Sequence, residues 1–94
     1  MKDQLYVMSA KIPESGIEKF NEYESRVLPL LKEHGGILER RLQSHDRLKE
    51  LHIIRLPSIQ SFENYRDDPR RSQYTSLLVE SGAATELTIM NDLY

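Results

Sequence analysis

The 94-residue chain contains no cysteine and no tryptophan. The absence of cysteine excludes disulfide bonds, thiolate nucleophiles and cysteine-bound metal sites. An excess of one charge is missing too, because 13 Lys and Arg stand against 15 Asp and Glu, which leaves a net charge of −2. Nucleic-acid-binding domains usually carry a basic excess, so we expect no nucleic-acid partner.

Long apolar runs and nucleotide-binding motifs are also absent. No segment reaches the roughly 18 apolar residues that a membrane span requires. The polar residues 1–4 lead directly into an alternating segment, without the pattern of a signal peptide. We therefore expect no membrane partner and a cytoplasmic location. A glycine-rich phosphate loop, a Rossmann fingerprint and a Gly-x-Ser-x-Gly motif are missing, so nothing indicates a nucleotide cofactor or a serine hydrolase.

The hydrophobic pattern predicts one domain that spans residues 1–94. Alternation of apolar and polar residues predicts four strands, and apolar residues at helical spacing predict two helices between them. The predicted strands cover residues 5–12, 37–44, 50–56 and 86–90. In the second strand, strict alternation places Leu38, Arg40 and Leu42 on one face and Ile37, Glu39 and Arg41 on the other.

Capping signals mark the ends of the two predicted helices. Ser15 and Glu18 fit a capping box at the start of the first helix, and Gly35 is a typical left-handed terminator at its end. The second helix is predicted to start at the cap Ser58. It is then predicted to restart at Asp68-Pro69, where Asp caps and Pro occupies the first helical position.

The resulting order, βαββαβ, is that of a ferredoxin-like α+β fold. Its crossovers place both helices on one face of a four-stranded antiparallel sheet. The face away from the helices would carry several large apolar side chains, too many for a small monomer to leave in water. A second copy stacked sheet to sheet would cover them, so the pattern predicts a homodimer through this face.

Several segments along the chain follow the pattern of a known superfamily. They are Tyr6-Val7-Met8, Val27-Leu28-Pro29-Leu30, Glu33-His34-Gly35-Gly36, Ile54-Arg55-Leu56-Pro57-Ser58 with Phe62, and Asp68-Pro69 ahead of Tyr74. Together they resemble the dimeric α/β-barrel superfamily, which includes the antibiotic-biosynthesis monooxygenase-like proteins, and within it a small bacterial family without an assigned function. The resemblance implies a ferredoxin-like dimeric barrel and a cofactor-independent monooxygenase or isomerase that acts on a small aromatic or carbonyl compound.

Haem and metal ions are not expected as cofactors. Haem-degrading members of the superfamily use a Trp on the sheet and a His on the second helix. This chain has no Trp, and residues 58–79 contain no His. The three histidines of the chain stand at unrelated spacings, without the arrangement of a metal site.

His52 is the candidate catalytic residue, because histidine transfers protons near neutral pH. It shares a strand face with Ile54 and Leu56, and it would border the cleft if that face packs under the helices. The alternative is a hydrogen-bonded core histidine without a catalytic role.

Four further residues are candidates for ligand binding. Tyr23, Tyr65 and Tyr74 could direct their hydroxyl groups into the cleft, although a tyrosine at the rim of a core has the same pattern. Arg55 could anchor an anionic group of a ligand. Its alternative is a structural ion pair with Glu39 or Glu86.

Three functions are therefore open at the level of the sequence. The first is the enzyme described above, and the second is a non-catalytic small-ligand-binding or stress-related dimer. The third is a structural or interaction protein with a filled cleft. A cavity lined by His52 and at least two tyrosines favours ligand binding or catalysis, whereas a cleft filled by Phe20, Phe62 and Leu78 favours the third function.

Overall fold

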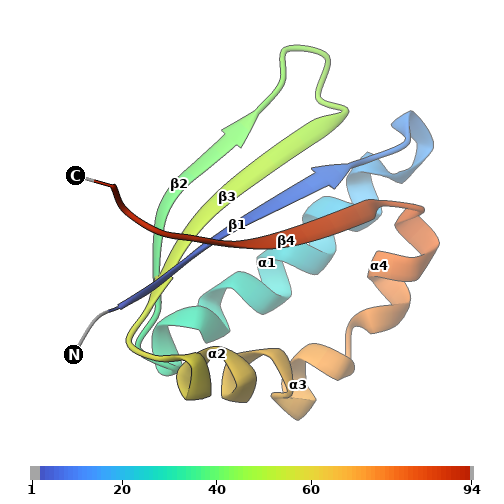
Figure 1. Cartoon of the computed structure of the whole chain (residues 1–94). Coiled ribbons are helices and arrows are strands. Elements are labelled where there is room, and N and C mark those ends of the chain that lie inside the picture. Colours follow the sequence, from blue (N-terminus) through green and yellow to red (C-terminus); the bar gives the residue numbers. More distant parts are fainter. Residues whose placement is uncertain (1–2, 94) are drawn as a thin grey trace.

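A computed structural model describes residues 3–93 of the chain (Figure 1). Its sheet has the order β2-β3-β1-β4, and each neighbouring pair is antiparallel. This is the strand order of the predicted ferredoxin-like fold. The strands are β1 (Gln4–Lys11), β2 (Ile37–Gln43), β3 (Lys49–Leu56) and β4 (Ala84–Met90).

The helices lie together on one side of the sheet (Figure 1). They are α1 (Ile17–Glu33), α2 (Ile59–Arg66), α3 (Pro69–Ser72) and α4 (Thr75–Ser81). The second predicted helix is thus divided into three short ones. The break at Asp68-Pro69 confirms the prediction, whereas the break before Thr75 was not predicted. No helix within residues 3–93 is long and apolar enough to cross a membrane.

The core fills the space between the helices and the sheet. In one part of it, Leu30 and Leu31 of α1 pack with Tyr6 and Leu56 from the two central strands. In the other part, Phe20 of α1 packs with Ala10 and Ile12 at the far end of β1. Long side chains from both layers therefore fix α1 along the sheet.

Three of the four predicted signals at helix ends are present and one is wrong. Asp68 caps α3, because its side chain accepts a hydrogen bond from the Arg70 N–H at 2.9 Å. The Ser58 hydroxyl accepts a hydrogen bond from the Ser61 N–H at 3.1 Å, and Gly35 has a φ of +78°. Ser15, in contrast, lies in a 3₁₀ turn, and α1 starts after Gly16 without a side-chain cap. A Cβ atom on Gly16 would lie 1.8 Å from the carbonyl oxygen of Ser81. The start of α1 therefore packs backbone to backbone against the end of α4.

A β-bulge at Glu39 overturns the predicted faces of β2. Leu38 lies opposite Ile54, but Arg40, and not Glu39, lies opposite Ile53. Because a shift of one residue exchanges the two faces of a strand, Arg41 turns to the helix side, opposite His52. Glu39 stays on the outer face and accepts a hydrogen bond from Arg55 Nε at 2.8 Å, which confirms the predicted ion pair.

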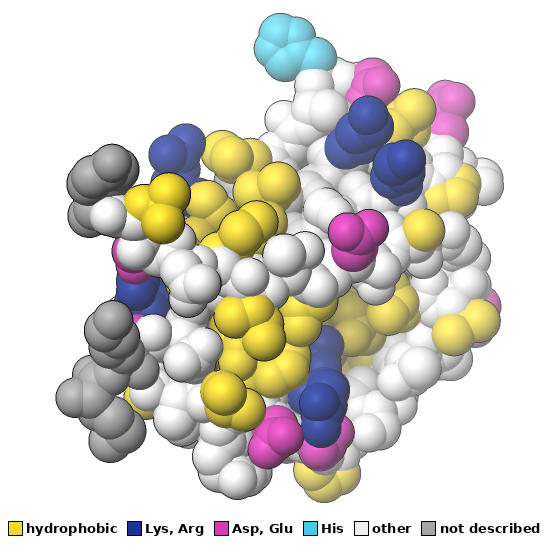
Figure 2. Space-filling model, in the orientation of Figure 1, with side chains coloured by type: hydrophobic (Ala, Val, Ile, Leu, Met, Phe, Trp, Pro, Cys, Tyr) yellow, Lys and Arg dark blue, Asp and Glu magenta, His cyan; other side chains and the backbone are white. Residues whose placement is uncertain are grey.

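The outer face of the sheet, away from the helices, has no helix over it. It carries exposed apolar side chains, among them Ile37 (59% exposed) and Met90 (43% exposed). Figure 2 shows hydrophobic side chains gathered over the strands above β4, and a second group below β4, between that strand and the helices. This face is the one for which the sequence predicts a partner.

Replacement of the two serines at helix starts should separate a real cap from a failed one. We expect Ser58→Ala to lower the free energy of unfolding by about 1 kcal/mol, because the Ser61 N–H loses its acceptor. Ser15→Ala should change it by less than about 0.5 kcal/mol. Urea titrations of both variants measure the difference, and equal losses would contradict this assignment of the caps.

Candidate functional site

A cavity of about 270 Å³ lies between the sheet and the helices, with its lining drawn from α1, α2, Arg71 of α3, and strands β1, β3 and β4. Five aliphatic side chains and the ring of Phe62 form the apolar part of the lining. The polar side chains that reach it are Glu24, His52, Tyr65, Arg66, Arg71 and Thr85. An apolar cavity with a few convergent polar groups is the usual form of a small-molecule site.

His52 of β3 is buried at the inner end of this cavity, with 1% of its surface exposed. Its Nε2 lies 2.7 Å from Glu50 Oε1, and its Nδ1 lies 3.7 Å from Glu24 Oε2. Burial lowers the pKa of His52 below its ordinary value of 6.5, although Glu50 opposes this shift. A neutral ring that donates Nε2–H to Glu50 leaves Nδ1 without a proton, facing Glu24.

Glu50 is the buried anion next to His52. Burial alone would raise the pKa of Glu50, but hydrogen bonds from Arg41 and His52 outweigh it and hold that pKa below its usual value. Arg41 Nε donates to Glu50 Oε1 at 2.6 Å, and the Arg41 side chain is 41% exposed. A chain of contacts thus runs from the surface through Arg41 and Glu50 to His52.

Glu24 of α1 is buried on the cavity wall, with 4% of its surface exposed. Burial, followed by the negative charge of Glu50, raises the pKa of Glu24 to about 7, against the opposing charges of Arg41 and Arg71. No hydrogen bond to the Glu24 side chain is formed within residues 3–93 beyond the long contact with His52. Near neutral pH this carboxyl group can therefore both accept and donate a proton.

Arg71 of α3 brings a positive charge to the cavity. Its guanidinium lies 4.6 Å from the centre of the Tyr65 ring, and its Nη2 donates to the Tyr23 hydroxyl at 3.1 Å. The Arg71 Nε atom is buried and has no hydrogen-bond partner among the described residues. An unpaired buried N–H is costly, and an acceptor on a bound ligand would satisfy it. Burial raises the pKa of Tyr65 to about 12, so its hydroxyl stays protonated.

The structure brings two of the five predicted site residues, His52 and Tyr65, to the cavity lining. Tyr23 lies outside the lining and accepts a hydrogen bond from Arg71, which is part of it. Tyr74 lies outside the lining, where the guanidinium of Arg26 covers its ring at 5.7 Å. Arg55 lies on the outer face of the sheet and is paired with Glu39 and Asp92. Neither Tyr74 nor Arg55 can therefore share a ligand with His52 in this cavity.

Sequence reasoning missed Glu24, Glu50, Arg41 and Arg71. A signal existed for Glu24, which falls between Phe20, Val27 and Leu31 on the apolar stripe of α1 and is buried with them. Arg71 follows the predicted helix start at Asp68-Pro69, where a charged side chain is usually solvated, but it is half-buried over Tyr65.

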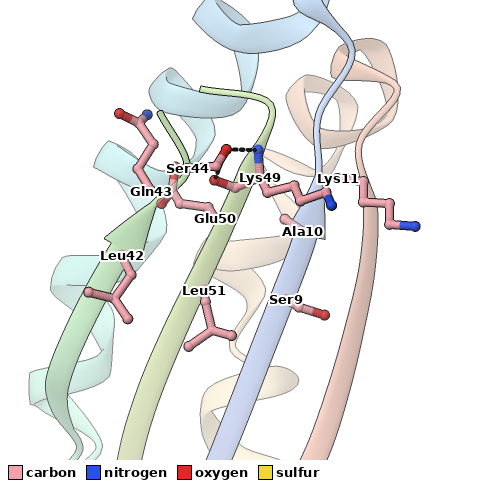
Figure 3. Close-up of a pocket in the computed structure, with 9 residues that line it drawn as sticks. All are labelled: Ser9, Ala10, Lys11, Leu42, Gln43, Ser44, Lys49, Glu50 and Leu51. Carbon is pink, nitrogen blue, oxygen red and sulfur yellow. Dashed lines mark hydrogen bonds between the residues drawn. The ribbon is translucent and has the colours of Figure 1, made fainter. Parts of the chain in front are cut away.

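A second hollow, of about 300 Å³, lies over β1, β2 and β3 at the hairpin end of the sheet (Figure 3). Leu42 and Leu51 lie opposite each other on neighbouring strands, and so do Lys11 and Lys49. These residues are on the outer face, whereas the buried carboxyl groups and His52 are on the helix side. Within residues 3–93, no cluster of three or more His, Asp or Glu side chains could hold a metal ion.

No protein-family model and no curated protein sequence matches this chain. Solved structures do. SnoaB, a cofactor-independent oxygenase from Streptomyces nogalater, has a TM-score of 0.82 at 11% identity, over 100% of this chain and 96% of SnoaB. An antibiotic biosynthesis monooxygenase-like protein of Nitrosomonas europaea has a TM-score of 0.79 at 14% identity, over 98% of this chain and 91% of that one.

A conserved protein of Methanosarcina mazei gives a similar result, with a TM-score of 0.79 at 18% identity over 98% of this chain and 94% of its own. These likenesses confirm the predicted resemblance at the level of the fold. The chain has the ferredoxin-like fold of the antibiotic biosynthesis monooxygenase-like proteins.

Glu24→Gln should change how stability depends on pH. The folded protein holds the Glu24 proton up to about pH 7, whereas the unfolded chain releases it near 4.5. The contribution of Glu24 to stability therefore falls by about 3 kcal/mol as pH rises through this window. We expect the stability of Glu24→Gln relative to wild type to increase from pH 4.5 to pH 8.

Urea titrations at both pH values measure this difference. The matched control is Glu22→Gln on the same helix, because Glu22 is exposed and its relative stability should stay nearly constant. A pH-independent difference for Glu24→Gln would contradict the raised pKa.

Proposed function

We propose that this chain is a cofactor-independent monooxygenase or isomerase that acts on a small aromatic or carbonyl compound bound in the helix-side cavity. The observation that carries the proposal is a buried pair of titratable groups, Glu24 and His52, 3.7 Å apart in a cavity with apolar walls and the cation of Arg71 beside it. Removal of a proton from the carbon next to a carbonyl group, or from the hydroxyl of a phenol, leaves an anion. A positive charge in a site of low polarity stabilises that anion.

The size of the cavity limits the ligand. An apolar cavity of about 150 Å³ holds one benzene molecule, so about 270 Å³ suits a compound of about two fused rings. The ring of Phe62 and the aliphatic side chains would contact the rings. The Arg71 Nε–H would donate to the ligand oxygen, and the protonated Tyr65 hydroxyl would lie on the same side.

Both reactions share the first step, in which a C–H or O–H bond of the substrate breaks and its electron pair stays on the substrate. In an isomerase the proton returns to another carbon of the same anion. In a monooxygenase the anion reacts with dioxygen: one oxygen atom replaces two hydrogens of a phenol ring as a carbonyl group, and the other leaves as water. The fold likeness to a cofactor-independent oxygenase supports the second reaction.

A non-catalytic small-ligand-binding or stress-related dimer is the second candidate. It is favoured by the burial of His52 between two carboxyl groups, which is also a way to stabilise a polar group in a core. Both candidate proteins bind a small compound, and only the enzyme converts it to a product. A structural or interaction protein with a filled cleft is disfavoured, because Phe20 and Leu78 pack in the other part of the core and leave this cavity open.

Deuterium exchange tests the shared first step. We expect the wild type to accelerate exchange of the α-protons of 2-tetralone, a two-ring ketone, when it is followed by proton NMR in D₂O. Arg71→Met should lower the rate by about 100-fold, because the developing oxyanion loses its donor. Lys32→Met, at an exposed position of α1, is the matched control and should keep the wild-type rate.

Binding without exchange would support the non-catalytic candidate. A thermal shift with 2-tetralone measures binding independently, because a ligand at about 100 times its dissociation constant adds about 2.7 kcal/mol to stability. Oxygen uptake with 1-naphthol then distinguishes a monooxygenase from an isomerase.

We also propose that the chain forms a homodimer through the outer face of the sheet. An interface of about 1,600 Å² that is half apolar gives a gross gain of about 20 kcal/mol. Ion pairs already formed within one chain, such as Arg55 with Glu39, lower the cost of placing charged residues there. Lys11 and Lys49 lie opposite each other on this face, and their positive charges favour a partner copy that places acidic side chains next to them.

Ile53→Asp should weaken the dimer much more than His45→Asp. Ile53 lies on the outer face of the central strand β3, opposite Val7, whereas His45 is exposed in the β2–β3 loop. In a twofold contact one substitution acts on both copies. Light scattering at micromolar concentration checks this. A wild-type mass near 11 kDa, or equal effects of both substitutions, would contradict the dimer.

A further inference from the structure

We infer that Glu24, and not His52, receives the proton of the substrate, and that His52 orients the Glu24 carboxyl group. This inference rests on the proposed function, which names only the pair. Glu24 was not among the residues that the sequence pointed to. The assignment follows from the positions of the two side chains in the cavity.

A ligand would compete with a carboxyl group at each nitrogen of the His52 ring. Nε2 faces Glu50 Oε1 at 2.7 Å and Nδ1 faces Glu24 Oε2 at 3.7 Å, so a carboxyl group stands at each of the two nitrogens. A group that takes a proton must come within hydrogen-bond distance of it. His52 could do so only after one of its neighbours had moved away.

Glu24 has the opposite arrangement. It lines the cavity, and the one Lys, Arg or His nitrogen within 4.0 Å of its carboxyl group among residues 3–93 is His52 Nδ1 at 3.7 Å, which is longer than a hydrogen bond. The Glu24 side chain is only 6% exposed, and a carboxyl group in such surroundings normally has hydrogen-bond partners. Its unused oxygen lone pairs beside an open cavity indicate that the partner is a ligand.

The proton transfer is balanced within the site. The C–H or O–H bond of the substrate breaks, its electron pair stays on the substrate, and the proton moves to a carboxylate oxygen of Glu24. The substrate becomes an anion beside the Arg71 guanidinium, while Glu24 becomes neutral. Its new O–H can then turn to the unprotonated Nδ1 of His52, which holds the acid in place until the proton returns to the product or leaves.

Charged and titratable groups from four other elements, and one from α1 itself, surround Glu24. A base that must be free of its proton works better as pH rises, so the wild-type rate should increase up to a plateau with a midpoint near the raised pKa of Glu24, about 7. For His52, whose pKa is lowered, the midpoint would fall below 6.5. The charged and titratable groups that surround Glu24 are His52 and Glu50 on β3, Arg41 on β2, Arg71 on α3, Tyr65 on α2 and Tyr23 on α1.

The experiment is 2-tetralone exchange between pH 5 and pH 9 with the wild type, Glu24→Gln, Glu24→Asp and the surface control Glu22→Gln. We expect Glu24→Gln to lose at least 100-fold in rate and Glu24→Asp to keep measurable exchange with a pH-dependent midpoint. Glu22→Gln should match the wild type. Circular dichroism and a urea titration establish that the Glu24→Gln variant is folded.

The outcomes separate this inference from the proposed function. Exchange by the wild type that persists in Glu24→Gln, or a wild-type midpoint below pH 6.5, overturns the role of Glu24 and leaves the proposed function in place. No exchange by the wild type overturns both. Loss in Glu24→Gln together with retention in Glu24→Asp supports Glu24 as the proton acceptor.

Discussion

The buried negative charge of Glu50 is the constraint on which the helix side of this protein depends. A carboxylate without partners in a core costs several kcal/mol, and here two donors, Arg41 Nε–H and His52 Nε2–H, reach the same oxygen. The first donor is available only because of the bulge at Glu39. Without it, strict alternation would place Arg40 on the helix side and Arg41 on the outer face. One extra residue in an edge strand thus brings Arg41 to Glu50, the carboxylate beside His52.

The fold was predictable from the sequence because local signals agreed with it. Alternation marked the four strands, and Ser58, Gly35 and Asp68-Pro69 marked helix ends through their own backbone chemistry. The errors arose where a contact between segments far apart in the sequence determines the local structure. Gly16 replaces the predicted cap because the chain passes against Ser81, and no local pattern reveals that neighbour. The bulge in β2 is equally hidden, because Leu38 and Leu42 are an even number of residues apart and would both fit one face of a regular strand.

The site was predictable only in part, for a related reason. His52 could be placed on an inner strand face from its neighbours Ile54 and Leu56, and the structure puts it at the cavity. Arg55 is three residues further on, so period-two geometry already sends it to the other face. Arg71 depends on the arrangement of three short helices, which helical periodicity alone does not determine. A fold shared at 11–18% identity does not supply such residues either, because chemistry belongs to the site and not to the fold.

No helix covers the edge strand β4, and this has a consequence for how such a site can diversify. Leu87 lines the cavity yet is 44% exposed, whereas His52 at the inner end is almost completely enclosed. The acid–base groups come from α1 and β3, and the open rim comes from β4. In the proposed enzyme, substitutions at the rim would therefore change the length or shape of the accepted compound without touching the groups that move the proton. Substrate range and reaction type would then be encoded in separate stretches of the sequence, and one could change in evolution while the other is retained.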